Sequence, residues 1–305
     1  MSPSTREAAW GFVFIGPWLI GLLLFTAGPM VASMLMSFTD FDLLHPDSWK
    51  FIGLDNYVRM ASDPNVAQSV RVTFVFAAIT VPLTMLASLG FAVLLNNPRL
   101  FGRSILRTLV YMPIQIPLVA GTLVWIGFLN PGTGWMNAIL AFFGIHPGPD
   151  WFNSTTWIYP ALSLIGLWGI GNFMLINLAG MQNVPTELYE AAKIDGANAW
   201  QRFVNVTVPL ISPTIFFNLI IATIGALSVF SVAYIGTQGG PAYATYFYVY
   251  HLYTSAFQYS LMGYASALAW IFLVIVLLLT VVQFRLSDRW VYYAGEPAGG
   301  GDDGE

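Results

Sequence analysis

The charged side chains near the middle of the chain form an isolated group between two apolar blocks. Residues 151–186 carry no Asp, Glu, Lys or Arg, and neither do residues 203–284. The charged residues between these blocks are Glu187, Glu190, Lys193, Asp195 and Arg202. Because a charge is costly inside a bilayer, this group must lie in water or against another protein.

The local pattern of this segment predicts two short helices joined by a bend. Glu187 follows a proline and stands in the first turn of the first helix, which continues to Ile194. Asp195 and Gly196 favour a turn, because glycine accepts backbone geometry that other residues resist. A helical pattern resumes over residues 197–206. From its amphipathic pattern alone, such a segment could also lie on the bilayer surface.

Small and charged residues alternate in a way that suits docking. Ala191, Ala192, Gly196 and Ala197 allow a partner surface to approach closely, and Glu190 and Asp195 offer charge at the rim. The sequence Glu190-Ala191-Ala192, followed by Asp195-Gly196-Ala197, Phe203, Pro209 and Pro213, resembles the EAA signature of ABC importer permeases.

This resemblance implies a role for each residue of the segment 187–213, hereafter the coupling segment. In that family it is a coupling helix that docks into a groove on the ATP-binding subunit. The resemblance implies that Glu190 contacts a basic group of the ATPase and that Gly196 sets the bend. Ala191, Ala192 and Ala197 would seat the helix.

The composition is that of an integral membrane protein. Of 305 residues, 57% are hydrophobic and only 9% are charged, against roughly a quarter in an ordinary soluble domain. The chain has no cysteine, which excludes disulfides and thiol metal sites. We expect a single permease domain over residues 1–293 and a disordered, acidic, Gly-rich tail at 294–305.

Six stretches are long enough to cross the hydrocarbon core, which needs roughly 20 apolar residues. Prolines at 113 and 117 are expected to kink the third stretch. With the N-terminus in the cytoplasm, the inner segments carry 8 Lys and Arg and the outer segments 3, which favours an N-in/C-in arrangement. The fold class expected is an all-α membrane protein with six transmembrane helices and the coupling segment between helices four and five. The six stretches are 10–38, 70–95, 105–129, 157–181, 210–235 and 261–284.

These stretches contain almost no ionisable group, which favours a neutral, hydroxyl-rich solute over ion coupling through carboxylates. Trp168 and Asn172 are spaced to share one helix face. Asn218 and Gly225 follow another face, and Ser228 lies beside it. These five residues are the candidate substrate pathway. The alternative is ordinary interhelical packing, in which small residues, Asn and Ser also serve.

The chain lacks the residue patterns that ATP binding, metal binding and catalysis by paired acids require. No Gly-Lys pair of a phosphate-binding loop is present, so ATP and Mg must be bound by another chain, and this chain needs no cofactor of its own. His45, His146 and His251 stand far apart, which predicts surface roles and no metal site. Asp40, Asp42 and Asp150 form no recognisable acidic pair for an enzyme.

The outer segments also resemble those of sugar permeases, notably Gly239-Gly240-Pro241. In detail the chain is similar to the maltose-transporter type, and within it to SugA-type permeases of mycobacterial trehalose importers. That implies a non-catalytic subunit importing a neutral sugar, such as trehalose, by alternating access across a bacterial inner membrane. It also implies a second homologous permease, an ATP-binding subunit dimer, an extracytoplasmic sugar-binding lipoprotein and surrounding lipid. The alternative left open is an ATPase-independent carrier or channel for a small neutral solute.

Overall fold

The computed structural model describes the backbone of residues 3–292 and the side chains of residues 10–292. Within this part of the chain every regular element is helical, apart from one isolated bridge between Thr39 and Phe51. The expectation of an all-α protein is therefore confirmed. The acidic tail expected to be disordered, residues 294–305, lies outside the described residues.

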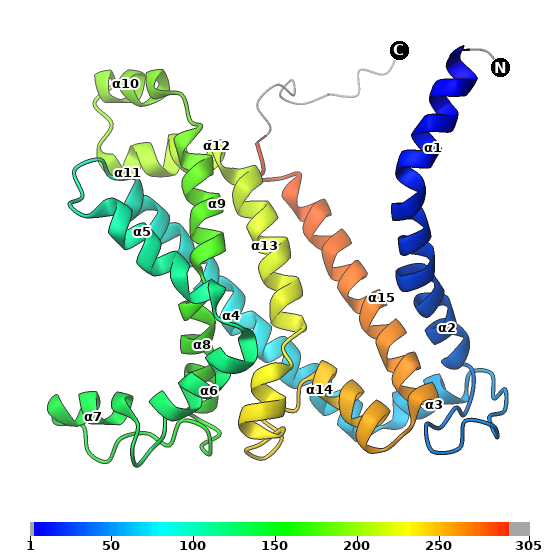
Figure 1. The fold of residues 1–305 in the computed structure, drawn as a ribbon. Helices are drawn as coiled ribbons and strands as arrows, with labels where there is room; N and C mark the ends of the chain where they lie inside the picture. Colours follow the sequence, from blue (N-terminus) through cyan, green and yellow to red (C-terminus); the bar gives the residue numbers. More distant parts are fainter. Residues whose placement is uncertain (1–2, 293–305) are drawn as a thin grey trace, which may run out of the picture. The chain divides into compact units, whose positions relative to one another are not determined.

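Figure 1 shows the helices, several of which end in short 3-10 or π turns. In chain order they are α1 (Pro3–Leu22), η1 (Leu23–Ala27), α2 (Gly28–Met36), α3 (Asp55–Ser62), α4 (Pro64–Asn96), α5 (Arg103–Tyr111), η2 (Met112–Gln115), α6 (Leu118–Phe128), α7 (Trp135–Phe142), α8 (Ile158–Trp168), α9 (Gly171–Gln182), α10 (Thr186–Ile194), α11 (Ala199–Arg202), η3 (Phe203–Thr207), α12 (Val208–Leu210), α13 (Ser212–Leu227), η4 (Ala233–Thr237), α14 (Tyr248–Tyr253), η5 (Thr254–Gln258) and α15 (Met262–Ser287).

Three continuous helices in the described residues are long and apolar enough to cross a membrane: Trp10–Met36, Pro64–Asn96 and Met262–Ser287. Three further pairs of helices pass the same test together but are sharply bent. The bends measure 106° between Arg103–Gln115 and Leu118–Phe128, 52° between Ile158–Trp168 and Gly171–Gln182, and 70° between Ala199–Leu210 and Ser212–Leu227. The chain is thus a multi-pass membrane protein with three straight candidate spans and three broken ones.

Proline accounts for the first of these bends, as the sequence predicted. Pro117 has an extended ψ of 136° and precedes the first residue of α6. A proline lacks the N–H that would continue the preceding helix, so the chain turns there. The break between α8 and α9 falls at Gly169 and Ile170, where no proline stands.

The described chain divides into two compact units. One contains the chain up to Ala67 together with His251–Ile275. In it Asn56 is buried and its Nδ2 donates to the carbonyl oxygens of Ser37 and Thr39, at 2.9 and 2.8 Å. The indole Nε1 of Trp270 donates to the hydroxyl of Ser33 at 3.0 Å. These bonds attach the segment after α2 to α3, and α2 to α15.

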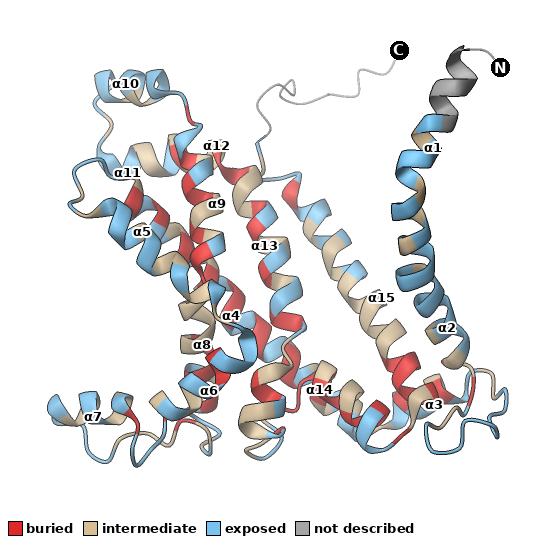
Figure 2. Cartoon of the chain, viewed as in Figure 1, coloured by how far each residue is buried: buried red, intermediate tan, exposed pale blue. Residues whose placement is uncertain are grey.

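The other unit contains Gln68–Tyr250 and the chain from Val276 on. It has two main buried clusters, visible as red segments in Figure 2. One lies between α4, α8 and the segment 229–250, with Phe76 and Phe247 in ring contact at 5.2 Å. The other joins α4, α9 and the residues that flank the coupling segment, with Met174 and Leu178 fully buried at its centre. The second cluster fixes the base of the coupling segment to the membrane helices.

Candidate functional site

The coupling segment has the two-helix form that its sequence predicts. Helix α10 ends at Ile194, and Gly196 takes a left-handed backbone with φ of +80°. The N–H of Gly196 donates to the carbonyl of Lys193 at 3.1 Å, and the N–H of Ala197 to that of Ala192 at 2.9 Å. This is the Schellman pattern, in which a glycine closes a helix and satisfies its last carbonyls. The assignment of the bend to Gly196 agrees with this geometry.

The second part of the segment is helical, as expected, and begins with a capped turn. Asn198 caps α11 with a capping box, because its side chain accepts from the N–H of Gln201 while the Gln201 side chain accepts from the N–H of Asn198. The helix continues through the π turn η3, which begins at Phe203, and ends at Leu210. The expected return of a helical pattern over residues 197–206 is therefore confirmed from Ala199 on. Tyr189 ties the two parts together through a 2.9 Å hydrogen bond between its hydroxyl and that of Thr207.

The outward face of the coupling segment is uncovered. Ile194 is 85% exposed and Trp200 is 70% exposed, although both are large and apolar. Among the predicted coupling residues, Glu190, Ala191, Asp195 and Gly196 are exposed, and Ala192 and Ala197 are partly buried. Large exposed apolar side chains beside charged ones are typical of a protein contact surface. Ile194 was not among the predicted coupling residues. It is the last residue of the first predicted helix, and that position was the sequence signal that could have identified it.

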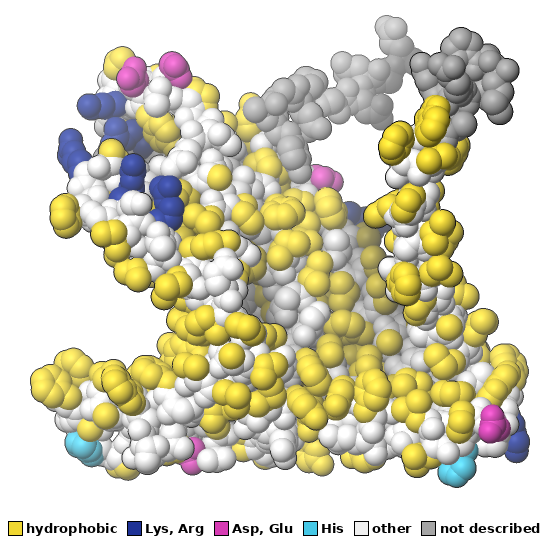
Figure 3. Space-filling model, viewed as in Figure 1, with side chains coloured by type: hydrophobic (Ala, Val, Ile, Leu, Met, Phe, Trp, Pro, Cys, Tyr) yellow, Lys and Arg dark blue, Asp and Glu magenta, His cyan; other side chains and the backbone are white. Residues whose placement is uncertain are grey.

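Basic side chains gather beside this surface. Figure 3 shows them over α5, α10 and α11, whose Lys and Arg residues are Arg103, Arg107, Lys193 and Arg202. None of them forms an ion pair within residues 10–292, where the two close acid–base contacts both involve histidine. The acidic groups of α10 are likewise free of such pairs. The charges of this face are therefore available to a partner.

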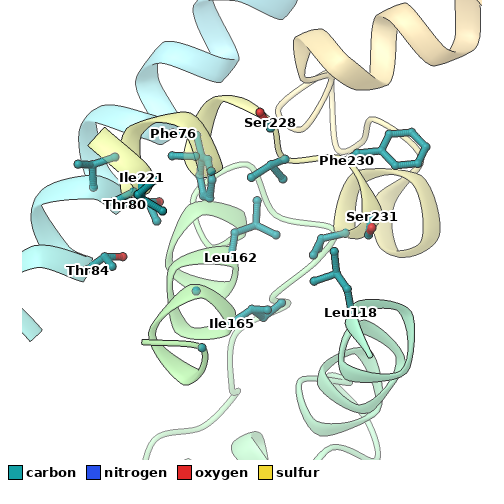
Figure 4. Close-up of a pocket in the computed structure, with 18 of the residues that line it drawn as sticks. Phe76, Thr80, Thr84, Leu118, Leu162, Ile165, Ile221, Ser228, Phe230 and Ser231 are labelled. Carbon is teal, nitrogen blue, oxygen red and sulfur yellow. The ribbon is translucent and has the colours of Figure 1, made fainter. Parts of the chain in front are cut away.

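The same unit contains a cavity of about 370 Å³ between α4, α8, α13 and the segment that follows α13 (Figure 4). No charged residue lines it. Its walls are aliphatic and aromatic, interrupted by four hydroxyl groups, on Thr80, Thr84, Ser228 and Ser231. A second cavity of about 440 Å³ borders Gln115 and the prolines that kink the chain before α6, and it shares Leu118, Ile165 and Gly169 with the first.

The five predicted pathway residues are distributed over four environments. Gly225 and Ser228 line the first cavity, and Trp168 lines the second, with its ring 5.8 Å from that of Trp125. Asn172 lines neither and is exposed. Asn218 is fully buried, and its Nδ2 donates to the side chain of Asn177 and to the carbonyl of Phe173.

One geometric expectation about these residues is wrong. Trp168 and Asn172 do not share one helix face, because α8 ends at Trp168 and α9 begins at Gly171 after a 52° bend. Thr80 and Thr84 were not singled out from the sequence. Threonines are common in transmembrane helices, so only their place on the cavity wall distinguishes them.

The histidines also need a correction. His45 and His146 are exposed as expected, but His251 is only 3% exposed. Its Nε2 lies 4.0 Å from a carboxylate oxygen of Asp63, which in turn accepts from the hydroxyl of Tyr264 at 2.9 Å. His251 is therefore part of a buried polar cluster instead of a surface. In the described residues no three His, Asp or Glu side chains come close enough together to hold a metal ion.

These features define a class of protein: a multi-pass helical protein with an uncharged internal cavity and an exposed, partly charged docking segment. Residues 85–292 match the family described as binding-protein-dependent transport system inner membrane component. The chain belongs to this family of ABC transporter permeases. Its identification as a permease subunit and not an enzyme, first made from the coupling segment, is confirmed.

Individual relatives cover nearly the whole chain. The chain is 44% identical over 93% of its length to the "Probable ABC transporter permease protein YesP" of Bacillus subtilis, of which it covers 92%. It is 35% identical over 92% of its length to the trehalose/maltose transport system permease protein MalF of Thermococcus litoralis, of which it covers 95%. Among solved structures, a bacterial alginate ABC transporter in complex with an alginate-bound periplasmic protein superposes with a TM-score of 0.78. Its sequence identity is 23%, with 94% of this chain and 96% of that one covered, so this likeness concerns the fold.

Proposed function

We propose that this chain is one of two permeases of an ATP-driven importer for a neutral sugar, with a disaccharide such as trehalose as its substrate. The observation that carries the proposal is the cavity beside α13, whose lining has hydroxyl groups and apolar surface but no charged side chain. A sugar presents hydroxyls at its rim and C–H groups on its ring faces, so it matches such walls. Relatives are named for transport of trehalose or maltose and of lactose, which supports the substrate class.

The same lining weighs against an anionic solute. One relative, 33% identical, is named for sn-glycerol-3-phosphate transport. A phosphate bound in a cavity needs cationic or N–H donors to replace its hydration, and arginine is the usual choice. Neither Lys nor Arg lines either cavity described above. We therefore place this chain with the relatives that carry neutral sugars.

The proposed topology has six spans, with three straight helices and three bent pairs each crossing once, and both termini in the cytoplasm of a bacterial inner membrane. The excess of Lys and Arg in the inner segments supports this orientation. It places the coupling segment in the cytoplasm, where an ATPase is found. Residues 1–293 would act as a single permease domain. The candidate pathway remains Trp168, Asn172, Asn218, Gly225 and Ser228.

The proposed partners are the chains that would perform the functions this permease does not perform alone. A second homologous permease would supply the other half of the pathway, an ATPase dimer would bind ATP and Mg, and an extracytoplasmic sugar-binding lipoprotein would deliver the substrate. Glu190, Asp195 and the small residues around them would contact the ATPase. Alternating access requires the importer to change between an inward-facing and an outward-facing state. Shifting that equilibrium from 1:99 to 99:1 requires about 5.5 kcal/mol of differential binding, which the coupling segment must transmit.

The test is purification of the tagged chain from gently solubilised native membranes, followed by reconstitution of the recovered assembly in liposomes. We expect a second permease, an ATPase and a solute-binding lipoprotein to copurify, and trehalose or another neutral sugar to be taken up only with ATP. Recovery of the chain alone, moving a solute without ATP, would contradict the proposal. Uptake of an anionic solute in preference to neutral sugars would contradict the substrate class.

A further inference from the structure

The turn between α4 and α5 presents an exposed aromatic side chain between two arginines. Residues 97–103 have the sequence Asn-Pro-Arg-Leu-Phe-Gly-Arg and are hereafter called the basic turn. The N–H of Arg99 donates to the Oδ1 of Asn97 at 3.0 Å, which gives the turn a defined shape. Phe101 is 97% exposed, and Arg99 and Arg103 are exposed on either side of it.

The leucine inside this turn is directed the other way. Leu100 is partly buried and packs against the second buried cluster, as do Tyr189 and Phe203 of the coupling segment. Val110 of α5 packs against the same cluster. The basic turn is thus fixed beside the base of the coupling segment, while its arginines and its aromatic ring remain uncovered.

The exposed apolar surface of the turn continues along the helix that follows it. Ile105 and Leu109 stand four residues apart in α5, so they share one face of the helix, and both are exposed. Helix α5 belongs to the first bent pair, which is apolar enough to cross a membrane. A water-soluble partner cannot follow this row of side chains into a bilayer, but the acyl chains of a lipid can. The row therefore favours lipid as the neighbour of Phe101.

No acidic side chain neutralises the arginines of the basic turn. Residues 64–149 contain neither Asp nor Glu. Within residues 10–292 no ion pair joins Arg99 or Arg103 to an acidic group of the coupling segment, such as Glu187 or Glu190. A guanidinium group matches a phosphate through two parallel hydrogen bonds, and clustered basic residues at the cytoplasmic membrane surface attract anionic lipids.

We propose that the basic turn binds the headgroup of an anionic phospholipid in the inner leaflet. Arg99 and Arg103 contact the phosphate, and Phe101 lies among the first carbons of the acyl chains. The inference goes beyond the proposed function and takes from it only the cytoplasmic position of this turn. Because Leu100 packs beside the coupling segment, the bound lipid would hold the base of that segment at the membrane surface.

The experiment uses a fluorescent label on Ser104→Cys, an exposed position next to the turn in a chain that has no native cysteine. The full chain is placed in vesicles of phosphatidylethanolamine and phosphatidylcholine that contain a small fraction of nitroxide-labelled phosphatidylglycerol or nitroxide-labelled phosphatidylcholine. Quenching reports which lipid lies beside the label. We expect quenching at a lower mole fraction of the phosphatidylglycerol. In Arg99→Gln/Arg103→Gln this preference should fall about 5-fold or more, since one arginine near an anionic surface contributes a factor of about that size.

The matched control is Arg285→Gln/Arg289→Gln. It removes two exposed arginines four positions apart near the end of α15, with Asp288 between them, and should leave the preference at the label unchanged. Arg99→Lys/Arg103→Lys retains the charge and should keep most of the preference. In the native chain, added NaCl should lower the preference because salt screens exposed charges, so the test does not depend on the folding of a variant.

Equal quenching by the two labelled lipids in the native chain would overturn the inference. An equal loss in both glutamine variants would also overturn it, because net charge and not the basic turn would then attract the lipid. A third contrary result is an unchanged lipid preference in Arg99→Gln/Arg103→Gln together with weaker binding of the ATPase dimer, which would make the turn part of the ATPase contact. The quenching assay contains neither sugar nor ATP, so its failure and a failure of sugar uptake are distinguished from each other.

Discussion

The side chains of Asn177 and Asn218 are fully buried and join three helices of the same unit by hydrogen bonds. Asn218 donates to the Oδ1 of Asn177 at 2.9 Å, and Asn177 donates to the hydroxyl of Ser88 at 3.2 Å. We predict that Asn177→Ala lowers the free energy of unfolding by about 2 kcal/mol, because it leaves buried polar groups on both sides without partners. Thermal unfolding in detergent measures this. The exposed Asn172→Ala is the control, and an equal loss in both variants would contradict the role of the network.

His251 supplies a prediction about pH. Burial lowers the pKa of its imidazole, and the nearby carboxylate of Asp63 acts in the opposite direction. Tyr264 and Arg59 also belong to this cluster, with the guanidinium 4.7 Å from the centre of the Tyr264 ring. As pH falls below about 6.5, the unfolded chain binds a proton that the folded chain does not, so stability decreases until the lowered pKa is reached.

The measurement is the melting temperature of the chain between pH 7.5 and pH 5. We expect His251→Gln to remove part of its decrease on acidification, whereas the exposed His146→Gln should leave the decrease as it is. If both variants responded to acid in the same way, His251 would not be the titrating group.

At the scale of single residues, the sequence shows which residue types are present but not which distant residues they contact. It selected Asn218 as a pathway residue because its spacing puts it on one helix face with Gly225. The structure places its side chain in contacts with residues 41 and 45 positions away, which no local pattern reveals. Thr80 shows the reverse: its residue type is ordinary, and only its place on the cavity wall distinguishes it.

Among the elements, the bend of the coupling segment gives the sharpest test. Gly196 has a φ of +80°, which proline cannot adopt, and its N–H is needed for the bond to Lys193. We predict that Gly196→Pro leaves membrane insertion intact but lowers ATP-driven sugar uptake at least 10-fold, since about 1.4 kcal/mol of lost coupling suffices for that factor.

The matched control is Gly196→Asn. Asparagine tolerates the left-handed region and keeps the N–H, and no atom lies within 4 Å of the position that its Cβ would take. Uptake by this variant should remain close to native. Sugar uptake and ATP hydrolysis are measured together in the reconstituted importer. Normal uptake by the proline variant would refute the role of the bend.

The helices show where sequence patterns succeed and where they fail. Pro117 predicted the 106° bend before α6, because proline removes a backbone donor whatever surrounds it. The break after Trp168 has no such residue, although glycines at 166, 169 and 171 weaken the helix there. Glycine permits a bend but does not require one. The close approach of α9 to α5, where a Cβ on Gly171 would lie 2.8 Å from the Cα of Tyr111, was visible only in the fold.

For the whole molecule, the first membrane helix raises the question of what surrounds it. The span Trp10–Met36 is apolar throughout, and none of its most apolar window is buried within the chain. Phe14 and Ile20 point to different sides of this helix, and both are exposed. In a lone permease both sides would face lipid. In an importer with two permeases, one side is expected to be covered by the partner.

Whether lipid or a partner covers each side of this helix can be measured by labelling, because the chain has no native cysteine to interfere. Phe14→Cys and Ile20→Cys are each given a spin label, and access of oxygen, which partitions into the bilayer, is measured in liposomes. We expect oxygen to reach both positions in the chain alone. In the complex with the second permease, access should fall at one position and stay unchanged at the other. Unchanged access at both positions in the assembled importer would mean that these two sides of the helix face lipid and that the two permeases meet elsewhere.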